Sequence, residues 1–153
     1  MSDAVATVEA AAEVTDELVA EIALLVPQLS DTARAPGKCE LEEIVFSPGT
    51  SLLLARATGS RRLLGMLTLV THQIPTGRRA VIEDVVVDRG SRGLGIGELL
   101  VTAALEGAAG YGARSVDLTS RPSREEANGL YTKLGFEQRM TNHYRYVLAT
   151  REN

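Results

Sequence analysis

The chain has 153 residues, 44% of them hydrophobic, and a formal net charge of −4 at pH 7. This length is sufficient to bury a core, so we expect residues 1–153 to form one domain. The negative charge argues against nucleic acid and against anionic membranes as main partners, because both favour a basic face. A single cysteine, Cys39, excludes an internal disulfide, and with no signal peptide or long apolar run the sequence predicts a cytoplasmic protein.

The first half of the chain predicts one strand, two helices and then three strands. A strand over Val5–Ala11 precedes a helix that Thr15 caps and that carries apolar residues on one side. A shorter helix is expected over Glu40–Val45, between glycine- and proline-containing turns. The three strands, separated by turns with glycine, are expected over Ser51–Ala57, Leu63–Ile74 and Ala80–Val87.

The segment after the last of these strands predicts a phosphate-binding loop. Residues 88–97 read DRGSRGLGIG and precede a long apolar-periodic stretch. Glycines let the backbone approach a ligand closely, and the first helical turn beyond them has amides without intrahelical partners. Arg89 and Arg92 add full charges to the partial positive charge of the helix N-terminus, so we expect the loop to bind a pyrophosphate. The alternative is a glycine-rich turn that only reverses the chain.

The spacing of the glycines separates three kinds of phosphate loop. A P-loop requires Gly-Lys-Ser/Thr, which does not occur in the sequence. The dinucleotide fingerprint G-x-G-x-x-G fails, because its third glycine falls on Glu98 or Leu100; a Rossmann-type enzyme with Asp117 at the ribose is therefore disfavoured. The loop instead resembles the R/Q-x-x-G-x-G/A signature with which the GNAT superfamily of acyltransferases binds the pyrophosphate of acetyl-CoA, here Arg92, Gly93, Leu94, Gly95, Ile96 and Gly97.

The rest of the chain predicts alternating helices and strands. An apolar stripe runs from Ile96 to Tyr111, and the next strand, Ser115–Thr119, is expected to pair in parallel with the strand before the loop. A helix is expected to start at a capping box of Ser123 and Glu126 and to stop at Gly135. Two last strands are expected over Phe136–Met140 and His143–Leu148. The fold class is therefore α/β (α+β), and the resemblance implies a mixed, largely antiparallel central sheet flanked by about four helices.

A second motif extends the resemblance to about residues 50–148. The segment NGLYTKLGF, residues 128–136, resembles the later asparagine–tyrosine–glycine–phenylalanine element of the GNAT superfamily. The resemblance implies a single acetyltransferase domain that transfers an acetyl group from acetyl-CoA to a primary amine, by direct attack within a ternary complex. It also implies a small-molecule or peptide amine as acceptor, and a homodimer as a possible assembly. A non-catalytic acyl-CoA-binding or sensing module is the alternative.

Acetyl transfer needs a base for the amine and an acid for the leaving thiolate. Glu83 resembles the acidic residue that accepts the amine proton in many relatives, with Asp84 or a water as alternatives. Because neighbours on a strand point to opposite faces, at most one of these two carboxylates is expected to line a given cleft. Tyr131 resembles the tyrosine that donates a proton to the CoA sulfur. It also fits an apolar helix stripe, and its ring can pack while its hydroxyl reaches the cleft.

The expected cofactor contacts come from two further places. Asn128 lies three residues before Tyr131 on one helix, so both can face the same ligand. The backbone of Val85, Val86 and Val87 is expected to bind the pantetheine arm as an added strand would. His72 and His143 lack companion ligands at metal spacing, so no metal site is evident. Nothing in the sequence identifies the acceptor. Three arginines, Arg78, Arg79 and Arg121, suggest an anionic group on the acceptor, but they are equally well explained as solvated surface charges.

Overall fold

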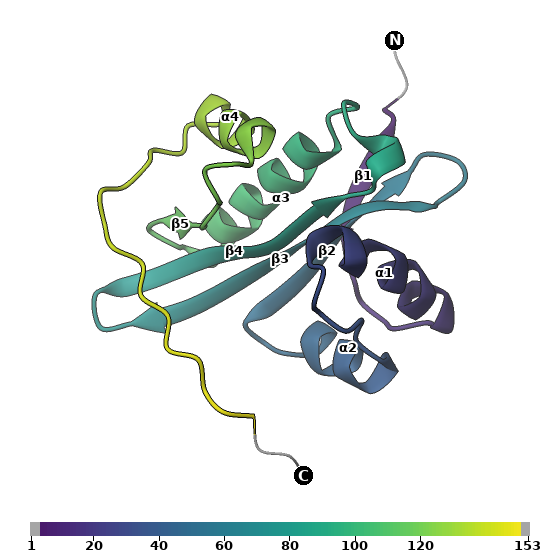
Figure 1. Cartoon of the computed structure of the whole chain (residues 1–153), viewed down its shortest axis with the longest axis horizontal. Coiled ribbons are helices and arrows are strands. Elements are labelled where there is room, and N and C mark those ends of the chain that lie inside the picture. The colour runs from purple at the N-terminus through teal and green to yellow at the C-terminus, as the bar shows by residue number, and fades with distance from the viewer. Residues whose placement is uncertain (1–3, 151–153) are drawn as a thin grey trace.

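A computed structural model describes residues 4–150 of the chain (Figure 1). Five strands form one sheet in the order β1-β2-β3-β4-β5. The neighbours from β1 to β4 pair antiparallel, and β4 pairs with β5 in parallel, as the sequence predicts. The strand bounds are β1 Ala6–Ala10, β2 Thr50–Ala57, β3 Leu63–Ile74, β4 Gly77–Val87 and β5 Val116–Asp117.

Helices cover both faces of the sheet, so the molecule has three layers. α1 (Asp16–Leu29) and α2 (Lys38–Val45) pack on one face, and α3 (Ile96–Tyr111) and α4 (Glu125–Lys133) on the other (Figure 1). A hydrophobic core lies on each side of the sheet, one around Leu67 and Leu100, the other around Ile22 and Leu41. None of the helices in residues 4–150 is long and apolar enough to cross a membrane.

The N-terminus of α1 is capped as its sequence predicts. The hydroxyl of Thr15 accepts a hydrogen bond from the backbone N–H of Leu18 at 3.1 Å. This bond satisfies one of the free amides of the first turn, a contribution of about 1 kcal/mol. The cap orients α1 so that Leu18, Ile22 and Val26 are buried against the sheet.

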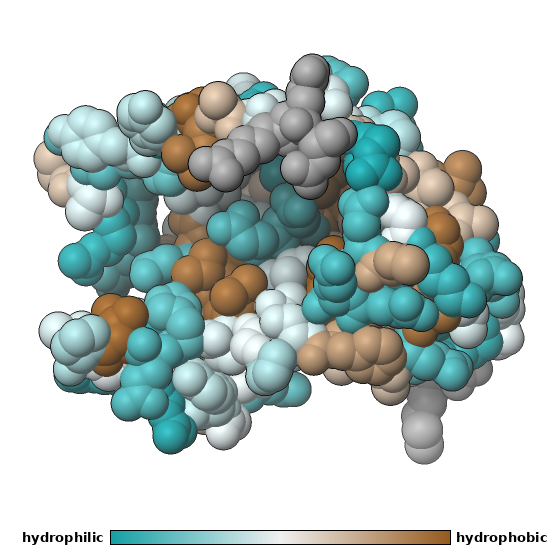
Figure 2. Space-filling view, turned by 90° about the horizontal axis from the view of Figure 1, so that it is seen from below, coloured by the Kyte–Doolittle hydropathy of each residue, from teal (hydrophilic) through white to brown (hydrophobic). Residues whose placement is uncertain are grey.

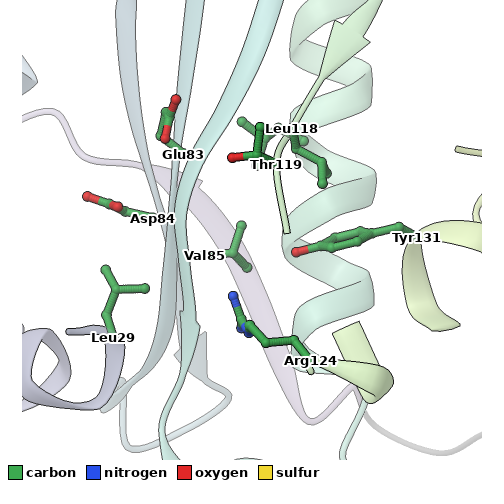
Figure 3. Close-up of a pocket in the computed structure, with 9 residues that line it drawn as sticks. Leu29, Glu83, Asp84, Val85, Leu118, Thr119, Arg124 and Tyr131 are labelled. Carbon is green, nitrogen blue, oxygen red and sulfur yellow. The ribbon is translucent and has the colours of Figure 1, made fainter. Parts of the chain in front are cut away.

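β4 contains a bulge between Glu83 and Val86. Met66 of β3 is paired with Val86, and Thr68 with Glu83, so a step of two residues on β3 opposes a step of three on β4. Asp84 adopts a left-handed backbone conformation, with φ of 50°. One extra residue in a strand of an antiparallel pair bends the strand and shifts the alternation of its side chains. Figure 3 shows this stretch of β4.

Beyond residue 81 the bulged strand separates from its parallel neighbour. β5 pairs with β4 only at Ala80 and Val81. The stretch of β4 from residue 82 to 87 therefore has no strand of the described chain on its β5 side. The predicted strand Ser115–Thr119 is present in shortened form, because two paired residues are all that this separation allows.

The structure corrects two predictions for the C-terminal part of the chain. α4 begins after Arg124, whose side chain forms no capping hydrogen bond, so the predicted capping box of Ser123 and Glu126 is absent. Residues 136–148 form no strand within the described part of the chain, and residues 137–150 are exposed. Side-chain alternation predicted strands there, but a strand also requires a neighbour for its backbone hydrogen bonds.

The exposed C-terminal stretch carries several large apolar side chains. Met140, Tyr144, Tyr146, Val147 and Leu148 are all more than three quarters exposed. On the face seen from below, apolar side chains are scattered among hydrophilic ones (Figure 2). Single apolar side chains at a surface are common in folded proteins, so they do not by themselves define a site.

Candidate active site

A cavity of about 170 Å³ lies where β4 separates from β5. Figure 3 shows Tyr131 of α4 directing its hydroxyl toward Val85 of β4, with Arg124 beside them. Asp84 and Leu29 lie on the other side of the strand in this view. The residues that line the cavity come from β4, from the end of α1, from the segment after β5, and from α4 and the residue before it: Leu29, Ile82, Glu83, Asp84, Val85, Leu118, Thr119, Arg124 and Tyr131.

Tyr131 combines a packed ring with a polar tip at this cavity. Only 7% of the residue is exposed, and its ring meets Phe136 edge-on with 5.8 Å between centroids. Burial raises the pKa of the Tyr131 hydroxyl above its ordinary value, with a smaller opposing effect from the charge of Arg124. The hydroxyl therefore stays protonated at neutral pH and is able to donate a proton.

Glu83 and Asp84 line the same cavity, which corrects the prediction that only one of them would. The prediction assumed an unbroken strand, in which neighbours alternate between faces. The bulge removes that alternation, and Ile82 and Val85 accordingly pack against the same core although they are three residues apart. Glu83 and Asp84 are thus the two acidic residues of this lining, and either is a candidate to accept a proton from a bound amine.

The loop after β4 is buried at both ends and exposed to solvent in the middle. Ser91 and Ile96 are buried, with 1% exposure each, whereas residues 92–95 are exposed. Gly93 and Gly95 both have φ of 79°, a conformation that side-chain-bearing residues rarely adopt. A Cβ at either position would point into open space, so the glycines leave room beside the backbone. This loop meets the requirements of a pyrophosphate site.

Gly97 and Glu98 join the beginning of α3 to α4. A Cβ at Gly97 would come within 3.3 Å of Leu130, so the glycine allows the two helices to approach closely. The carboxylate of Glu98 accepts a hydrogen bond from Lys133 Nζ at 2.9 Å. The loop and the helix that carries Tyr131 are thus positioned together.

The backbone of Val85, Val86 and Val87 runs along the unpaired side of β4. β3 occupies the opposite edge, where it pairs with Val86 and Val87. The Arg92 side chain folds back to donate from Nε to the Val87 carbonyl at 3.4 Å. An extended chain of amides is able to add to a free strand edge of this kind.

Asn128 does not line the cavity, although it lies on the same helix as Tyr131. Its side-chain amide donates to the carbonyl of Arg121 at 3.0 Å. Asn128 therefore fixes the turn that precedes α4 and carries Arg124 into the cavity. The sequence motif identified both residues but did not distinguish their positions.

Gln28 is a site residue that the sequence analysis missed. Its Nε2 donates to Asp88 Oδ1 at 2.9 Å, and its Oε1 accepts from the Arg89 amide at 2.8 Å. The side chain thus ties the end of α1 to the beginning of the glycine loop. No local pattern marks it, because the two partners are about sixty residues away along the chain.

A second and larger cavity, of about 390 Å³, lies between α1, α2 and the sheet. It shares Leu29 and Asp84 with the first cavity, so the two meet at the β4 bulge. Its volume falls within the range of small-molecule sites. Nowhere in residues 4–150 is a group of three or more His, Cys, Asp and Glu side chains arranged to hold a metal ion.

The comparison with protein families agrees with this geometry. The model described as the acetyltransferase (GNAT) family matches residues 18–136, well over half of the chain. The chain belongs to the GNAT acetyltransferase family. This confirms the resemblance on which the loop and the Tyr131 motif were interpreted, and it makes the chain a member of a family of acyltransferase enzymes.

One curated GNAT relative is similar over a limited stretch. Glucosamine 6-phosphate N-acetyltransferase 1 from Oryza sativa subsp. japonica is 41% identical over 63 residues. The matched stretch spans 41% of this chain and 36% of that relative, so the chain covers about a third of the relative's length.

Solved structures share the fold of this GNAT chain. An aminoglycoside acetyltransferase from an uncultured soil metagenomic sample, in complex with trehalose, is 20% identical with a TM-score of 0.82, over 96% of this chain and 99% of that one. Glucosamine-6-phosphate N-acetyltransferase from Arabidopsis thaliana is 21% identical with a TM-score of 0.77, over 92% and 97%. At these identities the likeness concerns the fold, and it confirms the predicted mixed, mostly antiparallel sheet with four helices.

The arginines suggested for an anionic acceptor line neither cavity of this GNAT chain. Arg78 donates to the Tyr111 carbonyl at 2.9 Å and lies over the Tyr111 ring. Arg79 donates to the Thr76 carbonyl at 3.3 Å. Both side chains therefore stabilise the β3–β4 turn and the end of α3.

Proposed function

We propose that this chain transfers an acetyl group from acetyl-CoA to a primary amine within a ternary complex, and that residues 1–153 form a single acetyltransferase domain. The observation that carries the proposal is the cavity at the β4 bulge. It places the protonated hydroxyl of Tyr131 at the stretch of β4 that carries Glu83 and Asp84 and leads into the glycine loop.

Two parts of the chain are proposed to hold the co-substrate. The open loop, with the amides of the first turn of α3 and the Arg92 charge, suits the pyrophosphate. The free edge of β4 suits the amide-rich pantetheine arm, which would bind the backbone of Val85, Val86 and Val87. Asn128 supports the site from within α4, where it holds the turn before the helix. The loop residues in these contacts are Arg92, Gly93, Leu94, Gly95, Ile96 and Gly97.

Acetyl-CoA supplies an activated thioester carbonyl. Glu83 accepts a proton from the bound amine, directly or through water, with Asp84 as the alternative acceptor at the same cavity. The amine nitrogen forms a bond to the carbonyl carbon as the carbon–sulfur bond breaks, and a backbone amide near Val85 polarises the carbonyl oxygen. Tyr131 gives its proton to the departing sulfur, so the products are an N-acetylated amine and CoA thiol.

The first experiment is a calorimetric titration of the protein with acetyl-CoA, with NAD and ATP as controls. Selective binding of acetyl-CoA supports the loop assignment, whereas its absence overturns it. Thiol release from acetyl-CoA in the presence of an amine then separates a transferase from a module that only binds acyl-CoA.

Gly95→Val tests the loop within the same titration. Its φ of 79° makes any β-branched side chain strained, and the new atoms would occupy the space beside the backbone. We expect Kd for acetyl-CoA to rise at least about tenfold, equivalent to about 1.4 kcal/mol. Gly110→Ala is the matched control, because Gly110 is a helical residue of α3 with open space around it and should bind as the natural chain does. Unchanged binding by Gly95→Val would contradict the assignment.

A further inference from the structure

The larger cavity has an aliphatic wall. α1 contributes Ile22, Val26 and Leu29, and further apolar side chains come from α2 and the sheet, among them Leu41, Ile44 and Met66. The polar lining consists of Ser30, Thr68, Arg34 and Asp84. A ligand body that fits this space would therefore transfer mainly from water to hydrocarbon.

The cavity lining contains one cation and one anion, and only the anion lacks a partner among the described residues. Arg34, the one cation in the lining, donates to Glu40 at 2.8 Å and to the Ala35 carbonyl, and its side chain is 75% exposed. Its charge is thus already paired at the surface. The side chain of Asp84 forms no hydrogen bond or ion pair with the described residues, and Asp84 lines both cavities at the bulge. The free charge of this cavity is negative and lies on the side that adjoins Tyr131 and Glu83.

We propose that this cavity is the acceptor site and that it selects primary amines carried on an apolar aliphatic or aryl-alkyl body, with Asp84 holding the ammonium at the junction of the two cavities. The inference rests on the proposed function and specifies its acceptor class. The apolar body enters between α1 and α2, and the nitrogen lies on the side of Glu83, which takes its proton before attack.

The same lining disfavours phosphorylated and polyhydroxylated amines. A phosphate placed against these aliphatic side chains would lose hydration and gain few donors, namely two hydroxyls and the already paired Arg34, and Asp84 would repel it. A sugar would leave several hydroxyl groups without partners. A polyamine would bring a second charge into the apolar space. The acceptors that name the curated and structural relatives, glucosamine 6-phosphate and aminoglycosides, are therefore poor fits to this cavity.

The test compares kcat/KM for thiol release across matched amines. We expect phenethylamine and pentylamine to exceed glucosamine 6-phosphate, putrescine and an aminoglycoside by at least about tenfold. In the series from ethylamine to pentylamine, each added methylene should raise kcat/KM about fourfold, which corresponds to about 0.8 kcal/mol of burial. Equal or better use of the phosphorylated or polycationic amines would overturn the acceptor class while leaving acetyl transfer in place.

A pair of bulky variants locates the effect in the cavity. Ala33 lines the cavity yet is exposed on the loop after α1, so Ala33→Trp should fill the space without disturbing the core. We expect kcat/KM for pentylamine to fall at least about tenfold, with Kd for acetyl-CoA unchanged. Thr32→Trp places the same side chain on the neighbouring residue, which does not line the cavity, and should change kcat/KM less than about twofold. Equal effects of the two variants would contradict the proposed site.

A binding measurement distinguishes failure of the acceptor class from failure of the proposed function. Phenethylamine is titrated calorimetrically into the protein saturated with CoA. Binding that Ala33→Trp abolishes, without any acetyl transfer, would support the apolar amine site and contradict the transferase function. No binding and no transfer of phenethylamine would overturn the acceptor proposal.

Discussion

Tyr131 shows how one side chain can pack in the core and still reach a cavity. Its ring is buried against Phe136, which fixes its direction, while its hydroxyl reaches the cavity at β4. The same burial disfavours the phenolate and keeps the proton in place. A tyrosine that packs in this way is pre-positioned, so little side-chain entropy is lost when substrates bind.

Tyr131→Phe should lower kcat while leaving acetyl-CoA binding almost unchanged. We expect a decrease of about a hundredfold, at the low end of general acid catalysis, because a thiolate is already a good leaving group. Because burial raises the pKa of Tyr131 above its ordinary value, any alkaline decrease in kcat caused by loss of its proton should lie at higher pH than the titration of a free tyrosine. Steady-state kinetics across pH and a Kd for acetyl-CoA provide the measurement.

Phe136→Leu is the control for the Tyr131 prediction. It removes the edge-on ring contact but keeps the hydroxyl, so kcat should decrease much less than in Tyr131→Phe. If Tyr131→Phe retained the natural kcat, the hydroxyl would have no part in proton transfer.

At the scale of elements, the glycine loop depends on α1 as well as on β4 and α3. Gln28 at the end of α1 binds both the Asp88 carboxylate and the Arg89 amide. Its hydrogen bond to Asp88 is the largest cause of the lowered pKa of that carboxyl group. The charge of Arg62 lowers this pKa further, whereas burial partly opposes the shift. A movement of α1, which also lines the acceptor cavity, would therefore be transmitted to the loop.

Gln28→Leu should weaken acetyl-CoA binding by loosening the loop. The loss of two hydrogen bonds predicts a rise in Kd of about fivefold to tenfold, or about 1–1.4 kcal/mol. The pKa of Asp88 should rise at the same time, which carboxyl chemical shifts followed over pH would record. Gln73→Leu, the same change at an exposed position of β3, is the control. A raised Asp88 pKa with unchanged Kd would show that the tether does not shape the loop.

At the scale of the whole molecule, carboxylates tie distant segments together and link stability to pH. Hydrogen bonding to Arg61 is the main cause of the lowered pKa of Glu9, with burial opposing and Arg56 adding to the shift. These groups join β1 to the β2–β3 turn, as Gln28 joins α1 to the loop. Because a carboxylate with a lowered pKa binds protons less readily in the folded than in the unfolded state, acid destabilises the fold.

We expect Tm to be nearly constant between about pH 8 and pH 5 and to fall below about pH 4.5, the ordinary value for Glu9. A carboxylate with a lowered pKa in the folded state stabilises the fold at pH values above its unfolded-state pKa. This stabilisation is lost as the pH falls through its folded-state pKa. Glu9→Gln should lower Tm slightly at neutral pH, because loss of this partly exposed pair reduces the free energy of unfolding by less than about 1 kcal/mol. Thermal melts of both proteins should converge in acid; a constant offset down to pH 3 would contradict this linkage.

Much of the fold was predictable because it depends on local patterns. The helix periodicity predicted α1 and α3, the hairpin turns predicted β2, β3 and β4, and Thr15 capped α1 as expected. The spacing of the loop glycines pointed to the family, which the family model confirms. Strand alternation failed where pairing decides the outcome: the bulge at Asp84 is fixed by the register with β3, and residues 136–148 form no strand among the described residues.

The sequence by itself determined most of the helices and strands, the family and the candidate site residues, because these follow from propensities and short spacings along the chain. Only the tertiary structure decided how those residues meet. It placed Glu83 and Asp84 on one cavity, tied Gln28 of α1 to the beginning of the loop, and joined an aliphatic cavity to the Tyr131 cavity at Asp84. Each of these depends on contacts between segments far apart in the chain, whose register and packing no local pattern specifies.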